Sequence, residues 1–157
     1  MCEHKLKTMA NSKEFVELFT RIVDRTLDGI VLVGYEADKF EILLVNPTIV
    51  HDFAASSGGE IAGKDYFDVM FGLNLKQSKE KEKAEKLPLY KVLVKREKVA
   101  TEPPYPTIAA RNKLAYQVET RVASIPINGS EKQIAFEFWR RMGNPQVFQK
   151  DPSFINI

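Results

Sequence analysis

The chain has 157 residues, 44% of them hydrophobic, and its 23 Lys and Arg against 21 Asp and Glu give a formal net charge of +2. This length and composition are typical of one domain with an ordinary hydrophobic core. The near-balance of charge gives no general attraction to nucleic acid or to anionic membranes. No apolar run approaches the roughly 20 residues that a membrane-spanning helix needs. We therefore expect a protein that binds neither nucleic acid nor membrane.

The cysteine, the two histidines and the first residues bear on metals and on the cellular compartment. Cys2 is the only cysteine, so no internal disulfide can form, and thiolate metal sites normally need several cysteines. His4 and His51 are far apart in the sequence, and neither belongs to a metal-binding motif. Residues 1–15 lack the apolar segment of a secretory signal. These features predict a cytoplasmic protein without a metal site.

The N-terminal part is predicted to be a flexible tail followed by an amphipathic helix. Residues 1–11 are polar and aperiodic. In residues 12–27, large apolar side chains recur at intervals of three and four, after a helix-capping Asn or Ser. This stripe consists of Phe15, Leu18, Phe19 and Ile22. It has to pack against something, either its own domain or a second copy of the chain.

Two strands and two short helices are predicted next. Ile30–Tyr35 and Glu41–Val45 are rich in aliphatic residues and are separated by a polar segment of hairpin length. Their near-continuous apolarity predicts strands that are covered on both faces. Asn46-Pro47 joins a helix-capping residue to a proline that the first helical position tolerates. A second helix is predicted over Asp65–Phe71, and Gly72 is placed as its C-terminal cap.

Three segments of different character occupy the middle of the chain. Residues 76–86 are almost wholly charged, with both signs mixed, which predicts a solvated helix or a mobile loop and not a binding patch. Leu89–Lys95 alternates between apolar and polar residues, which predicts a strand. Residues 99–112 contain three prolines, so we expect a loop or an extended edge there.

A long β-hairpin is predicted to close the sheet. Leu114–Ile127 alternates clearly, Asn128-Gly129 is a strong turn signal, and Ile134–Arg140 is the partner strand. In the first strand one face carries Leu114, Tyr116, Val118, Thr120 and Val122, and the other carries Gln117, Glu119 and Arg121. In the second strand we expect Ile134, Phe136 and Phe138 to point inward and Ala135, Glu137 and Trp139 to point outward. Gly143 and Pro145 end the regular structure, after which we expect anchoring by Phe148, Phe154 and Ile155.

The order and spacing of these elements resemble a PAS domain. The residues that carry the resemblance are Asp28-Gly29-Ile30, Leu44-Val45-Asn46-Pro47, Gly63-Lys64 before Asp65–Phe71, and the hairpin Leu114–Arg140. The match covers roughly residues 12–142, and the helix over 12–27 looks like the flanking helix common in that family. The resemblance implies an α+β fold, with a five-stranded antiparallel sheet in the order 2-1-5-4-3 and short helices on one face that enclose a pocket.

The resemblance also implies a domain organisation and a class of function. It divides the chain into a flexible tail (1–11), a single PAS-like domain (12–142) and a C-terminal tail (143–157). PAS domains serve as sensory or dimerisation modules inside signalling proteins and are seldom enzymes. Two features depart from the family: the inserts at 76–86 and 99–112 are long, and Trp139–Met142 replaces the usual ending. Either the output domain has been removed, or the module works without one in the same chain.

The cofactor classes of the family are tested by single residues. Flavin-thiol members need a cysteine on the short helix before the pocket, and residues 60–67 contain none. Haem-binding members use a histidine on the helix that we expect over Asp65–Phe71, which has none. His51 on the preceding helix could ligate a haem, but it also fits a partly exposed helix histidine. Trp139 could stack on a flavin, but its strand position points it away from Phe138. We predict no cofactor and leave a non-covalent ligand open.

A pocket between the sheet and the helices over 46–71 would be lined by inward apolar side chains. The candidates are Ile30, Leu32, Phe53, Phe67, Met70, Tyr116, Val118 and Phe138. The alternative is that these side chains fill the interior completely, because protein interiors normally pack without voids larger than a water.

The leading hypothesis is a non-catalytic signalling module that acts by dimerisation or by binding a PAS partner. There is no phosphate-binding loop and no nucleophile with a base at helical spacing, so no catalytic residue is predicted. The predicted interface consists of Phe15, Leu18, Phe19, Ile22 and Trp139, with the helix moving against an outer sheet face that carries Ala123, Ala135 and Trp139. The alternative function is a small-molecule or cofactor sensor, with its ligand held between the sheet and the helices over 46–71.

Overall fold

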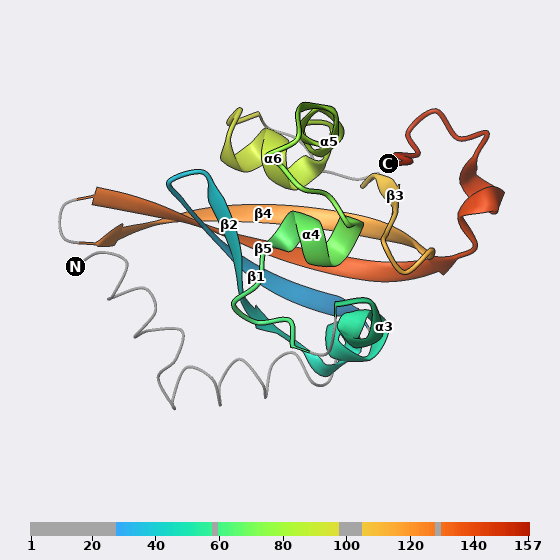
Figure 1. The fold of residues 1–157 in the computed structure, drawn as a ribbon, viewed down its shortest axis with the longest axis horizontal. Helices are drawn as coiled ribbons and strands as arrows, with labels where there is room; N and C mark the ends of the chain where they lie inside the picture. The colour runs from blue at the N-terminus through green and yellow to red at the C-terminus, as the bar shows by residue number, and fades with distance from the viewer. Residues whose placement is uncertain (1–27, 58–59, 98–104, 128–129) are drawn as a thin grey trace.

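The computed structural model describes residues 28–57, 60–97, 105–127 and 130–157, with the backbone alone for 55–57, 123–127 and 130–132. Figure 1 shows one sheet, in which two strands are much longer than the others, with short helices packed in front of it. The predicted tail over 1–11 and the predicted helix over 12–27 lie outside the described residues.

Five antiparallel strands form one sheet in the order β2-β1-β5-β4-β3. They are β1 (Gly29–Glu36), β2 (Lys39–Val45), β3 (Thr107–Ala109), β4 (Ala115–Ile127) and β5 (Ser130–Gly143). The predicted α+β class and strand order are confirmed. β5 lies at the centre, between β1 and β4, so the first and the last hairpin of the chain join there. The sheet is therefore complete only when its last strand is in place.

Four short α-helices cover one face of the sheet. They are α3 (Pro47–Ser57), α4 (Tyr66–Phe71), α5 (Ser78–Ala84) and α6 (Pro88–Leu93), and the 3₁₀ helix η1 (Pro145–Phe148) follows β5. Figure 1 shows α4 lying across the sheet, with α3 on one side of it and α5 and α6 on the other. The main hydrophobic core lies between this layer and the sheet, and it joins side chains of β1, β4 and β5 to those of all four helices.

The bounds of α4 follow from two capping residues, of which Gly72 was predicted and Asp65 is found by the structure. The Asp65 carboxylate accepts a hydrogen bond from the backbone N–H of Asp68 (3.0 Å), which satisfies a free donor of the first turn. Gly72 adopts the left-handed conformation (φ 68°) that a helix-terminating residue needs, and its N–H donates to the Asp68 carbonyl. The helix predicted over Asp65–Phe71 is confirmed.

The strand predicted over Leu89–Lys95 is wrong, because this segment forms α6. Pro88 occupies the first turn of α6, where its missing N–H costs nothing. Leu89, Tyr90 and Leu93 are all buried, so the spacing of four between Leu89 and Leu93 is a helical period. The charged segment before it forms the solvated helix α5, of which only Ala84 is buried. In a segment this short, apolar and polar residues can alternate by chance, and here tertiary packing favours the helix.

The predicted orientation of β5 is also wrong. Ala135 and Trp139 are buried in the main core under the helices, and Glu137 lies between them on the same face. Phe136 and Phe138 pack on the opposite face. Both faces of β5 are apolar, so the alternation of the strand does not say which face the helices cover. We call the face without these helices the outer face.

Candidate functional site

The eight side chains predicted to line a pocket do not come together. Five of them lie in the core under the helices and are at most 1% exposed: Phe53, Phe67, Met70, Tyr116 and Val118. The other three lie on the outer face: Ile30, Leu32 and Phe138. The five on the helix side belong to the same core cluster as Trp139, and the rings of Phe53 and Tyr116 contact its ring. Side chains therefore occupy the interior that the pocket was expected to take.

Trp139 is the centre of this filled interior. It is 1% exposed, and its ring lies 5.7 Å from that of Phe53, 5.7 Å from that of Phe71 and 5.2 Å from that of Tyr116. These are the distances of favourable aromatic contacts. The prediction that Trp139 and Ala135 lie on an outer interface is therefore wrong, and the side chain of Ala123 lies outside those described.

A carboxylate is buried beside this tryptophan. Glu137 is fully buried on β5 and accepts hydrogen bonds from the Thr120 hydroxyl on β4 (2.6 Å), from the indole N–H of Trp139 (3.1 Å) and from the Tyr66 hydroxyl on α4. Burial raises the pKa of the Glu137 carboxyl, although these three hydrogen bonds oppose the rise. Burial, and then the nearby Glu137, raises the pKa of the Tyr66 hydroxyl well above its ordinary value. Glu137 thus fastens α4 to the middle of the sheet.

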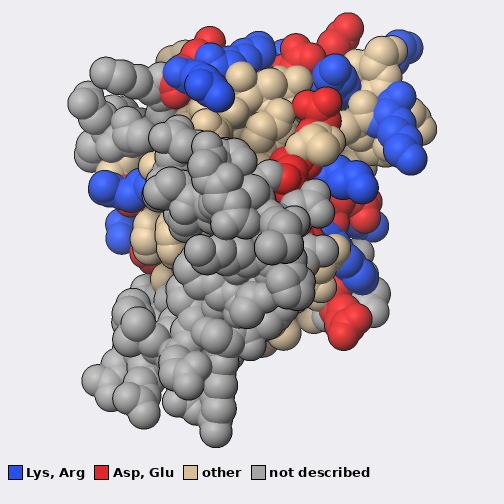
Figure 2. Space-filling view, turned by 90° about the vertical axis from the view of Figure 1, so that its left-hand side faces the viewer, with Lys and Arg blue, Asp and Glu red and all other residues tan. Residues whose placement is uncertain are grey.

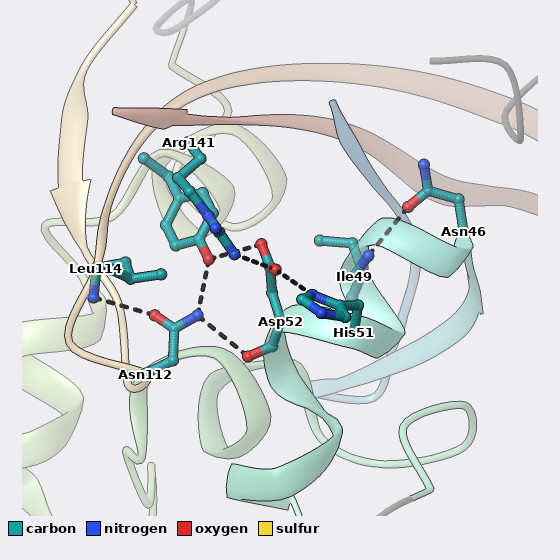
Figure 3. A network of polar contacts seen from close by, with 8 residues as sticks. Asn46, Ile49, His51, Asp52, Asn112, Leu114 and Arg141 are labelled. Atoms are coloured by element: carbon teal, nitrogen blue, oxygen red, sulfur yellow. Dashed lines mark hydrogen bonds and ion pairs between the residues drawn. The ribbon is translucent and has the colours of Figure 1, made fainter. Parts of the chain in front are cut away.

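A second carboxylate, Asp52, joins α3 to the far end of the sheet (Figure 3). Its side chain is 4% exposed, forms an ion pair with Arg141 of β5, and accepts a hydrogen bond from the Tyr116 hydroxyl of β4 (2.9 Å). The Asn112 amide donates to the Tyr116 oxygen (2.7 Å) and to the backbone carbonyl of Asp52 (3.2 Å). Burial raises the pKa of Tyr116 to about 12, and Asp52 also raises it. His51 lies next to Asp52, 3.1 Å from its carboxylate, but is 82% exposed.

Asn46 holds the start of α3 against β1. Its amide oxygen accepts hydrogen bonds from the backbone N–H of Ile30 (2.9 Å) and of Ile49 (3.3 Å), and its amide nitrogen donates to the Asp28 carbonyl (2.9 Å). The expected helix cap is confirmed by the hydrogen bond to Ile49 (Figure 3), and the same side chain also bridges to β1 through Ile30. Gly29 is needed beside it, because a Cβ there would lie 2.4 Å from Ile49 Cδ1.

Two grooves among the described residues lie elsewhere. One groove of about 630 Å³ runs between β2, α4 and the α5–α6 segment, and a second of about 430 Å³ follows the β1–β2 hairpin. Aromatic and aliphatic side chains line much of the first groove: Phe40, Leu73, Leu75, Tyr90 and Val94. None of the eight predicted pocket residues lines either groove. The polar residues of both grooves carry charges of both signs.

The outer face carries a second apolar cluster. Ile30, Leu32 and Ile134 are buried in it, and four half-buried side chains pack around them: Leu43, Leu44, Phe136 and Phe138. Ion pairs flank this cluster, with Arg140 Nε 3.5 Å from Asp28 and Arg121 Nη2 2.5 Å from Glu119. The cluster itself is apolar, and the charged pairs lie at its flanks.

On the described part of one side of the molecule, the surface charges do not gather by sign. Figure 2 shows Lys and Arg side chains interspersed with Asp and Glu over the described part of one side of the molecule. Such mixing gives no extended positive field of the kind that nucleic acids require.

Two further classes of site were sought among the described residues. These residues contain no group of three or more His, Cys, Asp or Glu side chains that could hold a metal ion. In the same part of the chain, no helix has both the length and the apolar character to cross a membrane.

Sequence reasoning missed both buried carboxylates. Glu137 had a signal, because a single acidic residue inside the apolar run Ile134–Trp139 is rarely buried without partners. Asp52 had none, because its partners Tyr116 and Arg141 are 64 and 89 residues away in the sequence.

No protein-family model matches this chain, and no curated protein matches it.

Proposed function

We propose that the chain is a PAS-type signalling module that has no catalytic role and acts by self-association. The strand order, and the position of the helices on one face of the sheet, are those that the resemblance implies. The single cysteine and the mixed surface charge support a cytoplasmic module that binds protein and neither nucleic acid nor membrane.

The observation that carries the proposal is the difference in packing between the two faces of the sheet. On the helix side, the side chains that would have lined a ligand pocket are packed against Trp139. This supports protein binding over the alternative of a sensor with a ligand between the sheet and the helices over 46–71. On the outer face, apolar side chains of β1, β2 and β5 form a continuous cluster.

The sequence before β1 supplies a partner for the outer cluster. The cluster begins at Ile30, and the amphipathic stripe predicted over 12–27 ends just before it. Phe15, Leu18, Phe19 and Ile22 provide the kind of apolar surface that such a face accepts. In a symmetric dimer, the stripe and the outer face of one copy bury those of the other in an isologous contact.

The proposal is tested by placing a charge on the stripe. Phe19→Asp puts a carboxylate into the contact, whereas Thr20→Asp adds the same charge one residue further, on the polar side of the predicted helix. We expect a dimer for the wild type and for Thr20→Asp, and a dimer at least about tenfold weaker for Phe19→Asp, which corresponds to about 1.4 kcal/mol. Sedimentation velocity over a concentration series measures this. A monomeric wild type, or equal dimerisation of the two variants, would refute the proposal.

A further inference from the structure

The last residues of the described chain lie along the edge of the sheet. Figure 1 shows the chain leaving β5, turning through η1 and returning to end beside β3. The backbone N–H of Ile155 donates to the Thr107 carbonyl (2.9 Å), and the N–H of Ala109 donates to the Ile155 carbonyl (3.0 Å). Ile155 and Ile108 form a parallel β-bridge. Residues around Ile155 thus act as a short sixth strand that caps the edge.

Side chains as well as backbone hold this segment. Ile155 and Ile157 both pack against the main hydrophobic core, whereas Asn156 between them is exposed. Residues two apart in an extended chain point to the same side, so the segment presents two aliphatic anchors and one solvent-facing residue. The core side chains at this edge include Ile108, which is 1% exposed.

The chain between β5 and this segment forms none of the strands of the sheet. Residues 144–153 contain η1 and two local caps, in which Asn144 accepts from the N–H of Gln146 (3.0 Å) and Asp151 accepts from that of Ser153 (2.9 Å). The rings of Phe148 and Phe154 lie 6.2 Å apart, which closes the loop on itself. Apart from contacts between η1 and β3, these interactions are local, and no residue after Gly143 takes part in the pairing of the five strands, so residues 154–157 can leave β3 without breaking that pairing.

Departure of the segment would expose a typical strand-addition edge. The Thr107 carbonyl and the Ala109 N–H would lose their partners, while β3 would stay paired with β4 on its other side. An unpaired strand edge binds extended peptides through main-chain hydrogen bonds, and adjacent apolar recesses select alternate side chains. Here the recesses are those that Ile155 and Ile157 fill.

We propose that the edge of β3 that faces away from β4 is a docking site for an extended peptide with aliphatic side chains at alternate positions. In this chain, residues 154–157 occupy that edge in cis and act as a built-in competitor. The partner is a protein segment of the pattern aliphatic–polar–aliphatic, which replaces Ile155, Asn156 and Ile157 with equivalent contacts. A tethered competitor acts at an effective concentration in the millimolar range, so the site is masked until this segment is displaced. The site is an edge of the sheet and is separate from its outer face.

The experiment uses the full chain and a labelled heptapeptide with the sequence of residues 151–157. Ile155→Asp removes the first anchor of the cis segment, and Asn156→Asp adds the same charge to the exposed neighbour. We expect the peptide to bind Ile155→Asp at least about tenfold more tightly than it binds the wild type or Asn156→Asp. The shifted backbone amides, followed by ¹⁵N nuclear magnetic resonance, should be those of Thr107–Ala109.

Three outcomes would overturn the proposal. They are equal peptide binding by wild type and Ile155→Asp, no shift at β3 in any variant at millimolar peptide, and a dimer of the wild type that Ile155→Asp abolishes. The last would mean that a second copy supplies the segment. If Ile155→Asp does not fold, cleavage of the folded full chain at a protease site inserted after Gln149 opens the edge instead, and the same shifts decide.

Discussion

The two faces of the sheet are both apolar, but they differ in how their polar groups are arranged. The helix side places two carboxylates among aromatic rings, and each carboxylate links a helix to the strands, Glu137 to α4 and Asp52 to α3. The outer face has no such link within its apolar cluster, and its ion pairs lie on the flanks. Buried hydrogen bonds fix a single arrangement of the parts that they join, whereas an apolar patch accepts any surface of matching shape. The helix side thus holds the fold together, and this difference supports the proposal that the outer face forms contacts with a partner.

The largest expected difference between the faces comes from removing an aromatic ring on each. Trp139→Ala leaves a cavity in the filled interior and frees the Glu137 carboxylate from one donor, so we expect a loss of about 3–5 kcal/mol in the free energy of unfolding. Phe138→Ala removes a half-buried ring from the outer face and should cost about 1–2 kcal/mol. Urea unfolding of the two variants measures both values. Equal losses would mean that the faces do not differ in this way.

The next effect is a dependence of stability on pH that comes from the buried Glu137 of the helix side. Burial raises the pKa of Glu137 above its ordinary value of 4.5, so the folded state keeps this proton at pH values where the unfolded state has lost it. By linkage, the contribution of this group is fully present below pH 4.5 and is lost as pH rises toward the raised pKa. Glu137→Gln should flatten this decline at a cost of about 1–2 kcal/mol at low pH.

Unfolding curves at a series of pH values, for wild type and Glu137→Gln, test this sign. Glu119→Gln is the matched control, because Glu119 lies on the outer face of β4 and forms an ion pair with Arg121. An unchanged pH profile in Glu137→Gln would mean that another group carries the dependence.

A further comparison sets the ion pair of the helix side, Asp52 with Arg141, against that of the outer side, Asp28 with Arg140. Asp52→Asn weakens an ion pair whose carboxylate is 4% exposed, and we expect a loss of about 1–3 kcal/mol. Arg140→Ala breaks the pair with Asp28 on the outer side, where Arg140 is 66% exposed, and should cost at most about 0.5 kcal/mol. Thermal unfolding at low and high salt distinguishes them. A larger loss of stability for Arg140→Ala than for Asp52→Asn would mean that the outer ion pair contributes more to stability than the one on the helix side.

The sequence predicted the sheet because its signals are local. Asn46-Pro47 and Gly72 each specify a helix end through contacts within a few residues, and both predictions are confirmed. The resemblance to PAS domains added the strand order, which no local signal contains. The expected anchoring of the last residues is confirmed, since the ring of Phe148 packs near that of Phe154 and Ile155 pairs with β3.

The errors on β5 and on the pocket share a physical cause. A strand that is buried on both faces lacks the alternation of apolar and polar residues from which the orientation of its side chains is predicted. β5 has apolar residues at successive positions from Ile134 to Trp139, broken only by Glu137, so its orientation depends on pairing with β1. Choosing Phe138 over Trp139 as the inward residue then mixed the two faces in the predicted pocket. The Asp52 network depends on residues that only the complete sheet brings together. Their spacing in the sequence does not predict it.

The most direct test of the central claim places one charge on the outer face. Phe138→Asp puts a carboxylate into the outer apolar cluster, and Val147→Asp adds the same charge at a residue that is 76% exposed and outside it. Sedimentation equilibrium, with far-ultraviolet circular dichroism to verify folding, should give dimers for the wild type and Val147→Asp and a folded monomer for Phe138→Asp. A folded Phe138→Asp variant that dimerises as tightly as Val147→Asp would contradict the account.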